Sequence, residues 1–397
     1  MDTAETSKEI LEEELLEKRK KMLKSFLLKH WRYSQYLILL FILWLGTYIR
    51  SQPLKNLVDS TTGRYISLEL DSTIFLRYAR YIVEHGRLFD IDPMRFYPLG
   101  GDIAGVGTFT SYFVAYLYKI FHFFIPSITV EYVDIIYPII SMIILTVFLF
   151  LLVRRLFDWK VALLSCLFLN VLPSFLFRSL GGSSDHDILA MMFVVMAFYF
   201  YVTGWQSKKT AHSLLFGLLC AIMTVLARET AGAGSFIILI LGLYSVVEIF
   251  LNRFEKKEFY LYACWIFSFT VIVAVLSGPE IIIALFGSLT TGIAYFSLIF
   301  SSLDYVLFKT TLLKTYSSKI KLPEGIVAMI LGVVIVFCFG LFLFGFEFFL
   351  DKIEQISSFL FKFYAETRWT ITVAENHRPF VADWIGQMGK TYVYLFI

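Results

Sequence analysis

Long apolar runs separated by short polar segments make up the chain from residue 33 onward. The first run covers residues 33–49, and eight more follow at 133–153, 159–178, 187–204, 212–227, 234–251, 259–277, 281–308 and 323–349. Because about 20 helical residues cross the hydrocarbon core, each run predicts one membrane span once tilt and ragged ends are allowed. Another run begins after Trp384. The pattern therefore predicts an all-α polytopic membrane protein with about nine complete spans and the start of a tenth.

The first 32 residues differ from the rest of the chain because they are rich in charge. Acids come first and bases follow, at spacings of three and four that pair opposite charges along one helical surface: Glu12, Glu13, Glu14 and Glu17, then Lys18, Arg19, Lys20 and Lys21. We expect residues 1–32 to form a cytoplasmic amphipathic helix, solvated or on the membrane surface. Residues 33–397 then form the transmembrane domain.

Composition and loop charge agree with a membrane protein and orient it. Of the 397 residues, 58% are hydrophobic and 17% are charged, whereas about a quarter of the residues of a soluble domain are charged. Basic loops are retained in the cytoplasm. Lys24, Lys29 and Arg32 precede the first span and so predict a cytoplasmic N-terminus. The outward side then receives the segments 51–132, 179–186, 228–233 and 350–385.

One apolar, aromatic segment, residues 108–124, can be read in two ways. As a span, it would turn the later basic loops outward, beginning with Arg154 and Arg155. Because basic loops belong in the cytoplasm, we expect this segment to be an interfacial or re-entrant helix. The chain stops at Ile397, barely inside its last apolar run, as expected of a truncated protein.

The outward segments hold the carboxylates that need an explanation. Asp185, His186 and Asp187 stand where one span ends and the next begins, while Asp71 and Glu375 lie in the two longest outward segments. Ionised groups near hydrocarbon are costly and are usually paired or functional. Two carboxylates this close can share a hard cation, with His186 as an extra ligand for Mn²⁺ or Zn²⁺. An aspartate can equally cap the following helix, and the pattern leaves both readings open.

Two arginines also face outward at the membrane boundary. Arg178 and Arg228 each lie near a glycine-rich stretch, at residues 181–182 and 231–234. A guanidinium group there suits bidentate contact with phosphate. Snorkelling of the side chain to lipid headgroups explains Arg228, taken alone, equally well.

Four sequence elements together resemble the catalytic subunit of asparagine-linked oligosaccharyltransferase, especially its single-subunit archaeal form. That family carries an aspartate and an arginine- and tyrosine-rich helix ending in His-Gly, here residues 71–86, followed by Tyr-Pro-Leu-Gly, here residues 97–100. An R-x6-DxD element follows, here residues 178–187, and a late outward loop carries TIxE or SVSE, here residues 372–375. Their order, spacing and expected side of the membrane agree over essentially the whole chain.

The resemblance implies a fold and a reaction. The fold would be a GT-C-type glycosyltransferase transmembrane bundle with long outward-facing loops. The reaction would move a glycan from a polyprenyl (dolichyl) phosphate or diphosphate carrier to the asparagine of an Asn-x-Ser/Thr acceptor protein, on the outer face of the plasma membrane. A single subunit would contact this lipid-linked oligosaccharide, the acceptor polypeptide and membrane lipid, and no nucleic acid. The family's C-terminal soluble domain with its WWDYG acceptor-recognition motif is expected to be absent here.

The resemblance also implies residue roles. Mn²⁺ or Mg²⁺ would be held by Asp71, Asp185, Asp187 and His186. Glu375, with help from Asp71, would bind and activate the acceptor amide, and Arg178 and Arg228 would bind the lipid phosphate. The catalytic residues would be Asp71, Glu375 and Arg178.

Two other function classes fit parts of the sequence. A mannosyltransferase-like enzyme that uses a polyprenyl-phosphate sugar would share the multispan architecture and the acids of the first outward loop. It would not need the late TVAE element at residues 372–375 or the R-x6-DxD element. A transporter of lipid-linked sugar would place ionisable residues near the middle of its spans, where this chain has almost none.

Overall fold

The computed structural model describes residues 2–103, 107–310, 322–361 and 380–396, and most of these residues are helical. The elements in chain order are α1 (Asp2–Ser51), η1 (Gln52–Asn56), α2 (Leu70–His85), β1 (Ile91–Asp92), β2 (Gly101–Asp102), α3 (Phe109–Phe124), α4 (Val130–Leu156), α5 (Trp159–Val171), α6 (Pro173–Phe177), α7 (His186–Trp205), α8 (Thr210–Ala231), α9 (Gly234–Phe250), α10 (Lys256–Ser277), α11 (Ile281–Gly287), α12 (Leu289–Asp304), the π-helical turn η2 (Tyr305–Lys309), α14 (Glu324–Phe361), α16 (Val381–Met388) and α17 (Lys390–Phe396).

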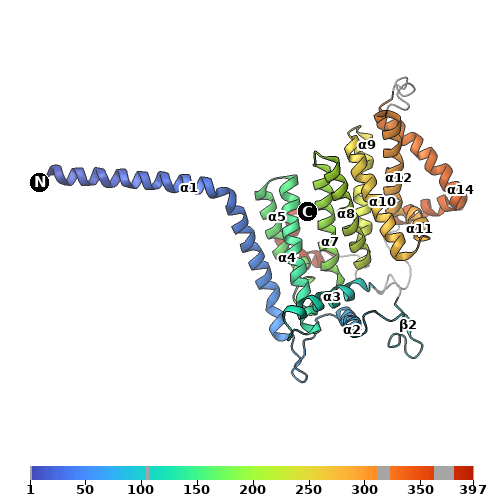
Figure 1. Cartoon of the computed structure of the whole chain (residues 1–397), viewed down its shortest axis with the longest axis horizontal. Coiled ribbons are helices and arrows are strands. Elements are labelled where there is room, and N and C mark those ends of the chain that lie inside the picture. The colour runs from blue at the N-terminus through green and yellow to red at the C-terminus, as the bar shows by residue number, and fades with distance from the viewer. Residues whose placement is uncertain (1, 104–106, 311–321, 362–379, 397) are drawn as a thin grey trace.

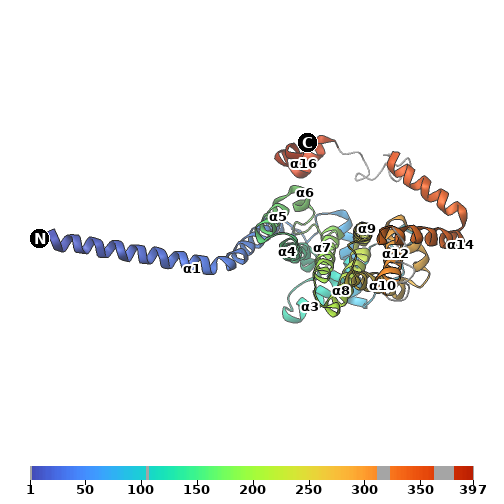
Figure 2. The ribbon, with the colours of Figure 1, turned by 90° about the horizontal axis from the view of Figure 1, so that it is seen from above.

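The long helices stand side by side as a bundle (Figures 1 and 2). Within the described residues, seven helical segments are long and apolar enough to cross a membrane: Tyr33–Asn56, Val130–Leu156, His186–Trp205, Thr210–Ala231, Lys256–Ser277, Leu289–Lys309 and Glu324–Ser357. The apolar helices α5 and α9 are shorter. Fully buried aromatic side chains on α10, among them Trp265 and Phe269, form part of the core between the helices. The prediction of an all-α polytopic membrane protein is confirmed.

Two of the expected spans are interrupted. The run at 159–178 divides at Leu172, whose ψ of 121° is extended, into α5 and the short α6. Pro173 explains this break, because proline lacks a backbone N–H and disfavours helical geometry in the residue before it. The run at 281–308 divides at Ser288, also extended with ψ of 139°, into α11 and α12. Apolar runs alone do not mark such breaks.

The ends of the chain contain helices longer than the apolar runs. Helix α1 continues without a break from Asp2 to Ser51, so the charged N-terminal segment and the first span form one helix. Figure 1 shows its N-terminal part extending away from the bundle. Helix α14 reaches Phe361, beyond the expected span end at residue 349, and bends at Gly345, whose φ is +77°. Glycine adopts this backbone conformation readily because it has no Cβ atom.

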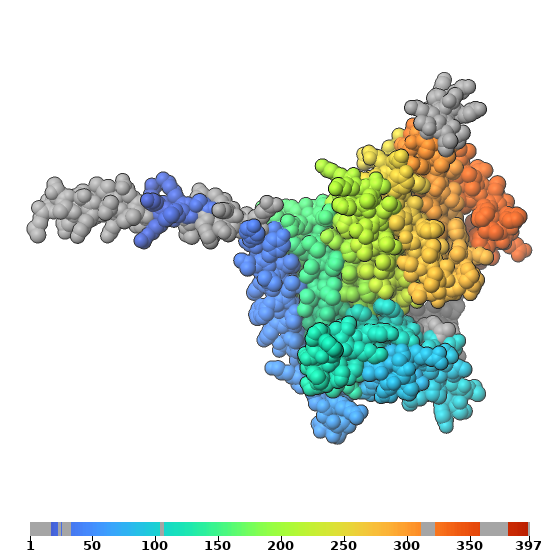
Figure 3. All heavy atoms as spheres, in the orientation of Figure 1, coloured from blue at the N-terminus to red at the C-terminus, as the bar shows by residue number. Residues whose placement is uncertain are grey.

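Described residues of the segment 51–132, which was expected to face outward, form a layer across one end of the bundle (Figure 3). Helices α2 and α3 pack against each other in this layer, and α3, the segment with two readings, lies across the bundle end in Figure 1. Strands β1 and β2 pair antiparallel, with Ile91 opposite Asp102 and Asp92 opposite Gly101. The Tyr-Pro-Leu-Gly element at residues 97–100 therefore lies in the connection of this hairpin.

Asp92 fastens the hairpin to α2. Its side chain is fully buried and forms an ion pair with Arg77, whose Nη1 lies 3.0 Å from Asp92 Oδ1. The Tyr78 hydroxyl donates to Asp92 Oδ2 at 2.8 Å, and the Met94 backbone N–H donates to Oδ1 at 3.0 Å. Burial opposes ionisation of Asp92, but these hydrogen bonds and the charge of Arg77 outweigh it and lower its pKa to about 2.

The Asp92 contacts predict a pH-dependent stability. Because the folded-state pKa lies below the ordinary value of 3.8, the stabilisation is complete above about pH 4 and is lost as pH falls toward 2. We expect Asp92→Asn to lower the free energy of unfolding by about 2 kcal/mol at neutral pH, by weakening charged hydrogen bonds. Thermal unfolding of both proteins across this pH range measures the difference.

The difference between wild type and Asp92→Asn should shrink as pH falls from about 4 toward 2. Asp90→Asn is the matched control, because Asp90 is an exposed carboxylate two residues earlier in the chain. A difference that stays constant down to pH 2 would show that the charge of Asp92 does not stabilise the hairpin.

Candidate active site

The start of α7 brings two carboxylates and an imidazole together. Asp185 is the N-cap residue, and its Oδ1 accepts a hydrogen bond from the backbone N–H of His186 at 2.7 Å. The same oxygen lies 2.7 Å from His186 Nδ1, and Asp187 Oδ1 lies 3.7 Å from His186 Nε2. One ligand atom of each of the three residues lies within 4.8 Å of the others. Capping and cation binding, which the sequence left as alternatives, are thus compatible in this geometry.

Arg178 faces both carboxylates of this group. It follows α6, and its Nη1 lies 3.7 Å from Asp185 Oδ2 and 3.5 Å from Asp187 Oδ2. Burial opposes ionisation of Asp185, but its hydrogen bond with His186 and the charges of His186 and Arg178 outweigh that effect and hold its pKa below the ordinary value. Asp185 is therefore an anionic carboxylate at neutral pH, as a cation ligand must be.

Helix α2 places Asp71 on the side of this group. Phe75 packs edge-on against the imidazole of His186, with ring centroids 5.8 Å apart and planes at 89°. Asp71 precedes Phe75 by four residues, so both lie on the same face of α2. Asp71 is exposed and lies outside the group of three whose ligand atoms are within 4.8 Å of one another. The charges of Asp71, Asp185 and Asp187 all attract a positive charge on His186.

A cavity of about 830 Å³ opens beside His186. Its wall contains Arg228, so the structure brings an expected metal ligand, His186, and an expected phosphate-binding residue into one space. The wall also includes carboxylates that sequence reasoning missed: Asp90, Asp102 and Glu229. Asp90 directly precedes β1, and Asp102 ends β2 opposite Ile91, so the hairpin brings the two carboxylates close together, which the sequence shows only once the pairing is known.

Arg228 is not free of protein partners. It forms an ion pair with the adjacent Glu229 near the C-terminal end of α8. An anion that binds Arg228 therefore either displaces Glu229 from the guanidinium group or binds that group alongside Glu229. Adjacent residues of a helix do not ordinarily face each other, so the sequence did not predict this pair.

Tyr137 of α4 is a further residue that sequence reasoning missed. Its side chain is fully buried, and its hydroxyl donates a hydrogen bond to the backbone carbonyl of Asp185 at 2.7 Å. It lies within an apolar run, where a tyrosine gives no sequence signal of contact with a site. Glu375, in contrast, was expected in the site and lies outside the described residues.

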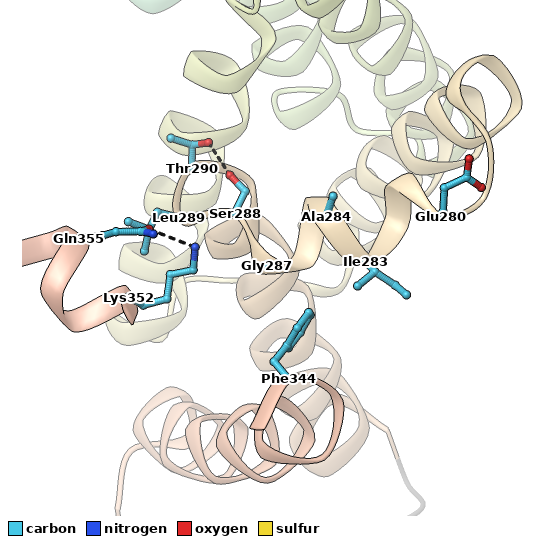
Figure 4. A pocket seen from close by; sticks show the side chains of 10 residues that line it. All are labelled: Glu280, Ile283, Ala284, Gly287, Ser288, Leu289, Thr290, Phe344, Lys352 and Gln355. Carbon is cyan, nitrogen blue, oxygen red and sulfur yellow. Dashed lines mark hydrogen bonds between the residues drawn. The ribbon is translucent and has the colours of Figure 1, made fainter. Parts of the chain in front are cut away.

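A second open space lies away from these residues. A groove of about 790 Å³ runs between α11, the start of α12 and α14, with Phe344 directed toward Gly287 and Lys352 donating to Gln355 at 3.2 Å (Figure 4). None of the expected site residues that the structure describes lines it. The groove therefore adds nothing to the chemistry of the site at α7.

A bundle of membrane-spanning helices with a polar cavity and long loops gathered at one end has the architecture of a GT-C membrane glycosyltransferase. The family model described as "Oligosaccharyl transferase STT3, N-terminal" matches residues 36–385. The chain therefore belongs to the STT3 family of oligosaccharyltransferases, of which it contains the N-terminal part.

Solved structures of the archaeal oligosaccharyltransferase of Archaeoglobus fulgidus have the same fold. The complex of this protein, AglB, with an inhibitory peptide and a dolichol-phosphate has a TM-score of 0.70 at 17% identity, over 92% of this chain and 44% of that chain. The complex with Zn and sulfate has a TM-score of 0.62 at 19% identity, over 82% and 43%. The form tethered to an acceptor peptide with the NVT sequon has a TM-score of 0.66 at 16% identity, over 92% and 43%. This chain thus spans less than half the length of these neighbours.

The Asp185 group predicts stabilisation by a divalent cation. A ligand that binds only the folded state at 100 times its Kd adds about 2.7 kcal/mol of stability. We expect Mn²⁺ to raise the thermal midpoint of the purified protein, and Asp185→Asn or Asp187→Asn to remove most of that increase. Differential scanning fluorimetry with and without Mn²⁺ measures this.

Asp158→Asn is a matched control for the cation experiment. Asp158 is the N-cap of α5 and accepts hydrogen bonds from the N–H groups of Lys160 and Val161, so the change removes the charge of a helix cap without altering the Asp185 group. Because asparagine caps helices about as well as aspartate, the variant should keep both its midpoint and the increase caused by Mn²⁺. Equal increases in all variants would argue against a cation site at α7.

Proposed function

We propose that this chain is the membrane-embedded catalytic part of an asparagine-linked oligosaccharyltransferase. It would transfer a glycan from a polyprenyl phosphate or diphosphate carrier to the asparagine of an Asn-x-Ser/Thr acceptor. The observation that supports this most is the Asp185–His186–Asp187 group, faced by Arg178 and beside a cavity that contains Arg228. Membership of the STT3 family supports the same reaction.

The donor atoms at α7 suit Mn²⁺ or Mg²⁺. Two carboxylates and an imidazole lie within reach of one ion, and Asp71 faces the group from α2. Carboxylates suit both ions, and an imidazole ligand favours Mn²⁺ over Mg²⁺. We propose that Asp71, Asp185, Asp187 and His186 hold the ion. When bound, the ion would supply positive charge near the phosphate leaving group.

The acceptor needs activation because its nucleophile is an amide nitrogen. The nitrogen lone pair is delocalised into the carbonyl group, so the side chain attacks poorly without help. We assign this help to Glu375 and Asp71, whose carboxylates would accept hydrogen bonds from the two amide N–H groups and favour rotation about the C–N bond. The new bond joins this nitrogen to the anomeric carbon of the glycan as the bond from that carbon to the carrier phosphate oxygen breaks. The electron pair of the broken bond stays on the phosphate, and one amide proton passes to one of these carboxylates.

Arg178 and Arg228 are proposed to bind the carrier phosphate. Arg178 is about half exposed, and Arg228 lines the cavity beside His186. Guanidinium groups bind phosphate oxygens through two parallel hydrogen bonds and keep their charge at all physiological pH values. They would stabilise the charge that develops on the leaving group as its bond to the glycan breaks.

Loop charge supports an orientation in the membrane, and the family resemblance supports the rest of the setting. We propose a cytoplasmic N-terminus, an active site on the outer face of the plasma membrane, and action as a single subunit. The Archaeoglobus fulgidus neighbours are described with dolichol-phosphate and with an acceptor peptide that contains an NVT sequon. Those complexes support a lipid-linked glycan and an acceptor polypeptide as the partners of this chain.

Transfer to a peptide tests the proposed reaction. Membranes that contain the full-length product of the gene would receive a polyprenyl-linked glycan, an Asn-x-Thr peptide and Mn²⁺. We expect glycopeptide from the wild type, and a loss of at least about 100-fold with Asp71→Ala or Glu375→Gln, because each removes a proposed contact to the reacting amide. Mass spectrometry of the peptide measures the product.

The matched control for these acids is Glu84→Gln, an exposed carboxylate near the end of α2 that should leave transfer unchanged. Transfer of sugar to a lipid or glycan acceptor, with the peptide untouched, would instead favour a mannosyltransferase-like enzyme. Full activity of Glu375→Gln would remove that residue from the proposed mechanism.

The phosphate assignment makes a separate kinetic prediction. Arg178→Lys and Arg228→Lys keep the charge but lose the paired hydrogen bonds, so the KM for the lipid-linked donor should rise roughly tenfold or more. The KM for the acceptor peptide should change little. Arg64→Lys, an exposed arginine of the first outward segment, is the control. Equal rises in the KM values of donor and acceptor would show a general loss of structure instead.

A further inference from the structure

The first turns of α4 hold the segment that leads into the Asp185 group. The backbone N–H of Gly182 donates to the carbonyl of Ile135 at 2.8 Å, and the Ser184 hydroxyl donates to the carbonyl of Asp134 at 2.9 Å. The Tyr137 hydroxyl donates to the carbonyl of Asp185 at 2.7 Å. These hydrogen bonds hold residues 182–185 against the first turns of α4, so a movement of α4 would shift Asp185.

The side chain of Asp134 reaches the other segment that carries a proposed ligand. Its Oδ2 accepts a hydrogen bond from the Ser67 hydroxyl at 2.9 Å. Ser67 precedes Asp71 by four residues, and Ser184 directly precedes Asp185. The two segments also touch through their main chains, because the Leu68 N–H donates to the Gly182 carbonyl at 2.8 Å. Asp134 therefore contacts both acid-bearing segments at once.

The presence of a carboxyl group at position 134 is not explained by a contribution to the stability of the fold. Asp134 is fully buried, and its Oδ1 has no hydrogen-bond partner among the described residues. Burying a carboxyl group that is incompletely hydrogen-bonded is unfavourable, and replacing it by an apolar group is often neutral for folding. A carboxyl group buried at such a cost is explained better by what it holds in position.

We infer that Asp134 is a positioning residue that fixes Asp71 relative to the Asp185–Asp187 pair. The inference rests on the proposed function, because it assumes that these three carboxylates hold one cation. Residues that hydrogen-bond and orient metal ligands without touching the metal matter for affinity. Removing one of them typically weakens metal binding roughly 10–100-fold. Asp134 would act through Ser67 on loop residues 67–71 and through its carbonyl on Ser184.

The test compares Mn²⁺ binding with stability in five variants. Full-length protein in lipid nanodiscs is titrated with Mn²⁺, and electron paramagnetic resonance counts the free ion. We expect Asp134→Ala and Ser67→Ala each to weaken Mn²⁺ binding roughly 10–100-fold without lowering the thermal midpoint measured in the absence of metal. Asp134→Asn retains an oxygen acceptor for Ser67 and should bind Mn²⁺ within about threefold of wild type.

Ser141→Ala is the matched control, since Ser141 is a fully buried polar residue two turns further along α4. It should leave Mn²⁺ binding unchanged. In the double variant with Asp134→Ala and Ser67→Ala, the loss of Mn²⁺ affinity should equal that of either single variant, because both changes remove the same hydrogen bond. Ser67→Ala keeps the test valid even if Asp134→Ala does not fold.

The possible results separate this inference from the proposed function. Unchanged Mn²⁺ binding in Ser67→Ala, or additive losses in the double variant, would overturn the positioning role of Asp134. A lower thermal midpoint together with weaker binding in Asp134→Asn would show that Asp134 acts by packing, and would also overturn it. If the variants behave as expected but the wild type glycosylates no peptide, the proposed function fails and the role of Asp134 in positioning the ligands stands. A wild type that binds no Mn²⁺ would overturn both.

Discussion

The exclusion of water from the hydrocarbon core is the constraint on which the rest of this structure depends. Every backbone polar group there must bond within a helix, so irregular segments and most charged groups lie at the ends of the bundle. The chain meets this constraint by collecting Asp185, Asp187 and Arg178 where α6 ends and α7 begins. The layer of α2, the β1–β2 hairpin and α3 then covers the same end.

Arg178 adjoins the proposed cation site and forms part of the proposed binding site of the carrier phosphate. It stands 3.5–3.7 Å from two carboxylates of the proposed cation site, and it is also proposed to bind the carrier phosphate. A cation bound to these carboxylates would reduce their hold on the guanidinium group and leave it available to an anion. Cation and phosphate binding would then favour each other through one side chain, as linkage between sites requires.

The parts that were predictable from sequence are those with a local signal. Apolar runs predicted the helices of the bundle, and the R-x6-DxD element marked Arg178, Asp185 and Asp187 as one short site segment. The contacts of Arg178 with the two aspartates were not predicted. The breaks at Leu172 and Ser288 were missed because the hydropathy of each run continues through them. Asp134 and Tyr137 were missed because they lie in an apolar run, and the carboxylates of the cavity because only tertiary folding brings them to α7.

The main-chain hydrogen bond from Leu68 to Gly182 has a consequence for the sequence changes that this chain can accommodate. A Cβ atom at Gly182 would lie 2.3 Å from Leu57, and its φ of +92° suits only glycine, so the junction has no room for a side chain. Ahead of it, Val58 and Tyr65 form a β-bridge that closes the exposed turn at residues 59–64. Because the junction is fixed behind this bridge, insertions or deletions in the turn can reshape the outer surface of the molecule while the carboxylates keep their positions.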